Sequence, residues 1–97
     1  MTLRIRLGDG FQNDTVSVRV DGKEVFQKSG VSTDWTISRA DAVQVQAEAP
    51  RVQLEVAVQD GPSAVLDVDL AHTPFVEVRL VNDKLELLPM GEEPPML

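Results

Sequence analysis

Residues 8–14 form the most polar and glycine-rich stretch of the chain, and metal-binding chemistry could be sought there first. Asp9, Asn13 and Asp14 offer hard oxygen ligands of the kind that Ca²⁺ prefers. The spacing does not fit an EF-hand loop, however, because Phe11 stands where a second Asp or Asn is required. Asp, Asn and Gly are also the residues that ordinary turns need. We therefore expect a turn with Phe11 packed into one end of the fold, and a calcium site as the alternative.

Acid–base catalysis would have to use the single histidine or a pair of aspartates. His72 precedes a Thr-Pro pair, and no serine stands in a G-x-S-x-G nucleophile motif. Asp67 and Asp69 share one strand face. They alternate with apolar residues over 66–70, and these apolar residues should face the core. We therefore predict no catalytic residue, no cofactor and no enzyme activity.

The net charge of the chain limits the classes of partner that it could bind. The chain has 97 residues with 16 acids against 9 bases, so its net charge is −7. Nucleic acids and anionic membranes need a basic footprint, which argues against both. No cysteine, signal peptide or membrane-spanning run is found in the sequence. We expect a soluble domain, and the lack of cysteine favours a cytoplasmic location.

Apolar and polar residues alternate two by two along most of the chain, and this period is typical of half-buried β-strands. Glycines and prolines lie between the alternating runs, where turns are needed. We predict strands near 2–7, 15–20, 23–27, 34–38, 42–48, 51–58, 64–70, 75–81 and 84–88. About eight or nine short strands with closely spaced turns predict a single small antiparallel β-sandwich, with a barrel as the alternative. The outline resembles immunoglobulin-like or prealbumin-like sandwiches in strand number and spacing only.

Two-residue turns fix the register of one hairpin. Residues 81–84, Val-Asn-Asp-Lys, place residues that tolerate positive φ at the centre of the turn. This turn pairs Leu80 with Leu85 inside the sandwich and Arg79 with Glu86 outside. A five-residue loop at 71–75 would further pair Asp67 with Arg79, leaving that arginine between two acids.

The second hairpin turns at Asp21-Gly22, a strong hairpin signal, but its register is ambiguous. A strict two-residue turn faces Val25 inward and Phe26 outward. One bulged residue would reverse the two side chains. Phe26 is therefore either a core residue or part of an exposed binding patch.

Residues 89–97 carry prolines and acids and are expected to form an extended arm after a domain at 1–88. Met96 and Leu97 end this arm and could bind a partner, as could Phe26. We therefore expect a non-catalytic β-sandwich module that binds a protein partner or, as a homodimer, a second copy through a sheet face or edge. The alternative is a calcium- or small-ligand-binding domain that uses the loops at 8–14 and 60–63.

Overall fold

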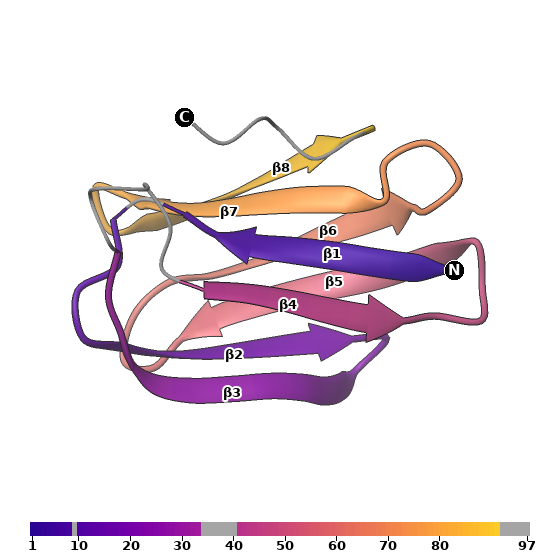
Figure 1. The fold of residues 1–97 in the computed structure, drawn as a ribbon. Coiled ribbons are helices and arrows are strands. Elements are labelled where there is room, and N and C mark those ends of the chain that lie inside the picture. The colour runs from indigo at the N-terminus through magenta and orange to yellow at the C-terminus, as the bar shows by residue number, and fades with distance from the viewer. Residues whose placement is uncertain (9, 34–40, 92–97) are drawn as a thin grey trace.

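The computed structural model describes residues 1–8, 10–33 and 41–91, with the side chain of residue 41 excepted. These residues form eight strands and no helix: β1 (Thr2–Leu7), β2 (Asp14–Val20), β3 (Lys23–Val31), β4 (Asp41–Gln46), β5 (Arg51–Val58), β6 (Ser63–Asp69), β7 (Phe75–Val81) and β8 (Lys84–Met90). Two four-stranded sheets stack face to face and are not closed into a barrel (Figure 1). The predicted all-β sandwich is confirmed. The strand expected at 34–38 lies outside the described residues.

The first sheet, sheet A, has the order β4-β1-β7-β8, and the second, sheet B, has the order β3-β2-β5-β6. Neighbouring strands are antiparallel except β1 and β7, which run parallel. Successive strands β1 and β2 lie in different sheets, whereas the first two strands of an immunoglobulin domain share one. The likeness to immunoglobulin-like sandwiches therefore stops at strand number and spacing.

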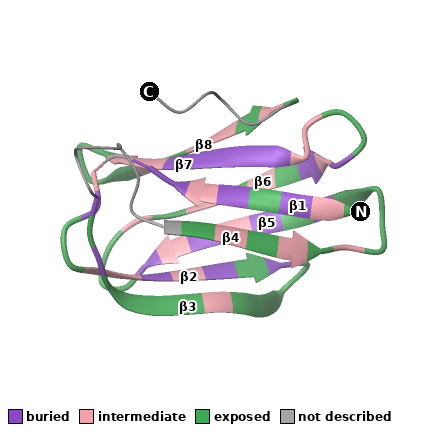
Figure 2. Cartoon of the chain, viewed as in Figure 1, coloured by how far each residue is buried: buried purple, intermediate pink, exposed green. Residues whose placement is uncertain are grey.

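The period of two places the core where the sequence predicts it, between the inner faces of the two sheets. Strands at the centre of each sheet are buried along their inner face, while β3 is exposed along most of its length (Figure 2). The buried apolar side chains of the core are Leu3, Ile5, Leu7, Phe11, Val16, Val18, Val20, Val31, Val52, Leu54, Val56, Val58, Val68, Leu70, Val76 and Val78. Only one of them is aromatic, so the core is built almost entirely from aliphatic side chains.

Both hairpins with two-residue turns form as predicted. Asp21 and Gly22 have φ of 51° and 81°, and Asn82 and Asp83 have φ of 51° and 61°. Positive φ at both central residues is the type I′ geometry, whose twist matches that of the flanking strands. In the second of these hairpins Leu80 pairs with Leu85 and Arg79 pairs with Glu86, as expected.

The connection between β6 and β7 differs from the prediction. The loop at 71–75 was expected to close a hairpin that pairs Asp67 with Arg79. Instead the chain crosses from sheet B to sheet A, so Asp67 pairs with Gln53 of β5 and β7 pairs with β1. A loop of this length can join strands of opposite sheets as readily as neighbours in one sheet, and the alternation of side chains is the same in both cases. Arg79 therefore does not lie between Asp67 and Glu86.

The ambiguity at Phe26 is resolved by a β-bulge. Val18 pairs with Phe26 and Arg19 pairs with Glu24, which leaves Val25 as the extra residue of β3. Phe26 therefore faces inward and packs against the core, while Val25 is 37% exposed.

The last strand is longer than expected. β8 continues through Pro89 to Met90, which pairs with Phe75. A proline is tolerated here because β8 is an edge strand. The expected arm therefore loses its first two residues to the sheet, and residues 92–97, with Met96 and Leu97, lie outside the described residues.

Candidate functional site

The four edge strands differ in how they are protected against pairing with another strand. Exposed edges are usually protected by charges, prolines or bulges. β3 has two register shifts and exposed Lys23, Glu24 and Lys28. β8 contains Pro89, and its neighbour across the sandwich, β6, contains Asp67 and Asp69.

β4 has none of these protections within its uncharged part. From residue 42 to residue 47 the sequence reads Ala-Val-Gln-Val-Gln-Ala, without charge, proline or glycine. The pairing of β4 with β1 is regular over all six residues, with no bulge. Among the four edges that the structure describes, β4 is the one that is regularly paired and carries no charge after its first residue, Asp41.

The hydrogen bonds of β4 show which backbone groups reach the open side of sheet A. Met1 and Ala47 exchange two hydrogen bonds of 2.8 Å each, so they form a hydrogen-bonded pair. Such pairs alternate along an antiparallel ladder. Val45 is therefore hydrogen-bonded to β1, whereas the backbone groups of Gln44 and Gln46 point away from it. No described strand pairs with β4 on that side.

Grooves flank β4 on both sides of its plane. On the inner side, a groove of about 420 Å³ lies between β4 and the β2–β3 hairpin. Its apolar lining includes Val20, Val25, Val45 and Ala47. β3 and β4 are the edge strands at this side of the sandwich and contact each other. The same groove is also lined by Asp21, Lys23 and Glu48, so a strand added to β4 would direct alternate side chains into a groove of mixed lining.

On the outer face of sheet A, a second groove of about 410 Å³ runs beside Gln44 and Phe75, with Arg4 and Arg6 in its lining. Phe75 is only 3% exposed although its strand phase places it on the outer face. Polar and aromatic groups thus meet the outward-facing side chains of β4.

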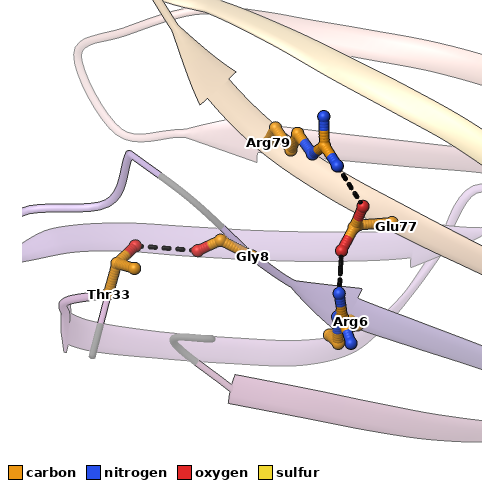
Figure 3. Close-up of polar contacts among 5 residues, drawn as sticks. All are labelled: Arg6, Gly8, Thr33, Glu77 and Arg79. Carbon is orange, nitrogen blue, oxygen red and sulfur yellow. Dashed lines mark hydrogen bonds and ion pairs between the residues drawn. The ribbon is translucent and has the colours of Figure 1, made fainter. Parts of the chain in front are cut away.

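An ion-paired triad covers the centre of this outer face (Figure 3). Glu77 of β7 is 3% exposed, and its two carboxylate oxygens are held by different arginines. The Nε of Arg6 donates to Oε1 over 3.0 Å, and Arg6 Nη2 contacts the same oxygen. Arg79 Nη2 lies 2.9 Å from Oε2. With all three groups committed to one another, the triad is a structural feature of the sheet and offers no unpaired base or acid for catalysis.

No pattern in the sequence singles out Glu77. Its position in the strand alternation marks it as an outer-face residue, and outer-face acids are ordinarily exposed. The available signal is that Glu77 and Arg79 share a face of one strand. Arg6 is 71 residues away, and only the parallel pairing of β1 with β7 brings it near.

Protein groups hold the described residues of the loop at 8–14. Thr33 is buried, accepts a hydrogen bond from the N–H of Phe11 over 3.0 Å, and donates to the carbonyl of Gly8 over 2.7 Å (Figure 3). Gly10 has φ of 97°, and a Cβ there would lie 1.8 Å from the carbonyl oxygen of Leu80. Glycine is therefore required at this position by conformation and packing.

The calcium candidates are only partly described. Asp9 lies outside the described residues. The carboxylate of Asp14 accepts from the N–H of Gln12 over 2.9 Å, and the N–H of Asn13 donates to Ser32 over 2.8 Å. Phe11 is buried, as expected. Among the described residues no three acidic or histidine side chains gather as metal ligands.

The alternative site required the loops at 8–14 and 60–63 to meet, and they do lie at one end of the sandwich. The N–H of Gln59 donates to the carbonyl of Thr15 over 2.8 Å. Proximity alone supplies no set of ligands for a small molecule.

His72 and Asp69 form a local pair that organises a loop. Nδ1 of exposed His72 lies 2.9 Å from Oδ2 of Asp69, whose other oxygen accepts from the N–H of Ala71 over 3.1 Å. The carbonyl of Asp69 accepts from both the N–H and the hydroxyl of Thr73. The hydrogen bond from His72 lowers the pKa of Asp69 below its ordinary value, and the N–H of Ala71 lowers it further.

Of the predicted partner-binding residues, Phe26 is described and lies against the core rather than on the surface. The structure instead indicates β4 as the candidate binding element. Its uncharged alternation over 42–47 predicts a strand, but it does not predict that this strand lies at an edge. Which strands are edges depends on sheet order, which the alternation does not encode.

No protein family model matches this chain, and comparison with curated proteins and with solved structures finds no match. Within the described residues, no helix has the length and apolar character needed to cross a membrane.

Proposed function

We propose that this protein is a non-catalytic β-sandwich module for protein interaction or assembly, and that its binding element is the open edge of β4. An extended segment of a protein partner would add to sheet A as a further strand. The observation that carries the proposal is the outward direction of the backbone groups of Gln44 and Gln46 on a regular, uncharged edge. Main-chain hydrogen bonds supply affinity in this mode of recognition, and pockets for alternate side chains supply specificity.

The surroundings of β4 support this mode. The inner groove has a mixed lining, in which valine and alanine side chains stand beside Asp21, Lys23 and Glu48, and its apolar part suits small apolar residues at every second position of an added strand. The outer groove places the side chain of Gln44 beside the intervening polar residues. An alternating apolar and polar strand fits both grooves at once.

The non-catalytic part of the proposal is supported by the placement of the candidate groups. The side chains of His72 and Asp69 bind each other within a loop, and the carboxylate of Glu77 is paired with two arginines. A cytoplasmic location, favoured by the cysteine-free sequence, belongs to the same proposal.

Amide chemical shifts in ¹⁵N-labelled protein test the proposal directly. The probe is a capped peptide of alternating valine and threonine, with one lysine at each end for solubility. We expect the largest shifts at the amides of Gln44 and Gln46, because these N–H groups gain a hydrogen-bond acceptor. Gln44→Pro removes one of these donors and should abolish the shifts without unfolding the chain, since a proline is tolerated where an edge N–H faces outward.

The matched control is Val65→Lys, which places a charge on the exposed outer face of edge strand β6. This variant should bind the peptide as the parent chain does. Shifts that map to another strand, or shifts that persist in Gln44→Pro, would overturn the proposal, as would their absence with millimolar peptide at protein concentrations where the chain is monomeric.

A further inference from the structure

We infer that the strand that adds to β4 is β4 of a second copy of this chain, so that two molecules form one continuous sheet across a two-fold axis at Val45. This inference rests on the proposed function, because it names the occupant of the same edge. Its basis is that β4 is complementary to itself in three independent respects: hydrogen-bonding direction, side-chain pattern and charge.

Hydrogen-bonding direction limits the register to pairings in which even-numbered residues of the two copies lie opposite each other. The outward-pointing backbone groups belong to even-numbered residues, Gln44 and Gln46. An antiparallel pairing about Val45 sets Gln44 opposite Gln46 of the second copy, and Gln46 opposite Gln44. Both pairs can exchange two backbone hydrogen bonds, as in any antiparallel ladder. A register shifted by one residue would instead set Gln44 opposite Val45, whose groups are already bonded to β1.

The side-chain pattern fits the same register. On the inner side Val45 meets its own copy and Val43 meets Ala47, so the paired side chains of the two β4 strands on this side are apolar. Directly opposed side chains of a pair without mutual hydrogen bonds approach closely, which favours contact between aliphatic groups. On the outer side the two glutamine side chains lie next to each other, and amides can act as both donor and acceptor.

Charge makes this edge the one that tolerates a copy of itself. The chain carries a net charge of −7, so two copies repel each other wherever acidic surfaces meet. In the register about Val45, Asp41 faces Ala49 and Glu48 faces Ala42, so no like charges stand directly opposite. A second copy also satisfies the symmetry of a closed dimer, in which one patch binds the same patch.

A cysteine placed on the two-fold axis tests both partner and register, and the chain has no cysteine of its own to interfere. Cα atoms of such a pair lie roughly 4.5 Å apart, within the range that a disulfide spans. We expect full-length Val45→Cys to form a covalent dimer under mild oxidation at least tenfold faster than Val65→Cys, the matched control on β6. Gln44→Cys should remain uncrosslinked alone but should crosslink when mixed with Gln46→Cys.

Sedimentation equilibrium of the chain without cysteines gives an independent measurement. The apparent mass should double with concentration up to about 1 mM, and the dimer should strengthen with added salt, because salt screens the repulsion between two acidic molecules. Gln44→Lys should remain monomeric, while Val65→Lys should dimerise like the parent chain.

The results separate this inference from the proposed function. A monomeric chain whose Val45→Cys and Val65→Cys variants crosslink equally slowly overturns the second copy as occupant. If the valine–threonine peptide still shifts Gln44 and Gln46, the edge binds other strands and the proposed function stands. If the peptide also fails, both are overturned.

Discussion

The two sheets share a core and a strand pattern, yet their outer faces and edges are built differently. Sheet A has a buried carboxylate at its centre and a regular, uncharged edge at β4. Sheet B has an exposed outer face with a loose ion pair, in which Arg19 lies 3.8 Å from Glu55, and a bulged, charged edge at β3. Sheet A thus has an ion-paired carboxylate at its centre and a regular edge at one side, whereas sheet B has a protected edge on the same side of the molecule.

The outer faces of the two sheets also differ in their balance of charged side chains. The outer positions of sheet A hold more cations than acids, although the chain is acidic: Arg4, Arg6, Arg79 and Lys84 against Glu77 and Glu86. The outer positions of sheet B hold more acids than cations: Arg19 and Arg51 against Glu24, Glu55, Asp67 and Asp69. The acidity of the composition is therefore not spread evenly, and sheet A is the face that repels an acidic partner least.

Removing one carboxylate from each sheet should give the largest contrast. Glu77→Gln leaves Arg6, whose side chain is 16% exposed, without its carboxylate. Breaking a buried pair in this way costs about 3–5 kcal/mol. Glu55→Gln, the matched variant in sheet B, breaks an exposed pair worth about 0–1 kcal/mol. Urea unfolding of both variants measures the difference, and equal losses would show that the two outer faces are energetically alike.

Pairings set by residues close in the sequence could be predicted, whereas pairings between distant segments could not. The turn at Asn82-Asp83 is local, so its register over Leu80–Leu85 follows from two residues and the alternation. The partner of β7 is set instead by which sheet the chain enters after Asp69, and the alternation is the same for either sheet. The candidate site depends on this sheet order. In the order β4-β1-β7-β8, β4 has β1 as its single neighbouring strand among the described residues, and this makes β4 an edge.

Neighbouring residues of β3 should show how its bulge protects the edge. Phe26 packs against the core, so Phe26→Ala should cost about 2 kcal/mol, less than the 3–5 kcal/mol of a fully buried phenylalanine. Val25 is the bulged, exposed residue, and Val25→Ala should change stability by less than about 0.5 kcal/mol. Thermal or urea unfolding decides the order. A larger loss for Val25→Ala would mean that β3 pairs without the bulge and is as regular an edge as β4.

The smallest effect concerns pH and the far edge of sheet B, at the end of β6. Because the hydrogen bond from His72 lowers the pKa of Asp69 below the 3.8 of a free side chain, the folded state binds this proton less readily than the unfolded state. The resulting stabilisation is complete above pH 3.8 and is lost as the pH falls through the folded pKa. His72→Ala should move the pKa of Asp69 back toward its ordinary value, as a carboxyl ¹³C titration would measure, with Asp67 as the internal control in the same strand. An unchanged Asp69 titration would mean that the pair does not organise the loop. The β6 edge of sheet B would then not end in a loop held by side-chain hydrogen bonds. It would no longer differ in this respect from the β4 edge of sheet A.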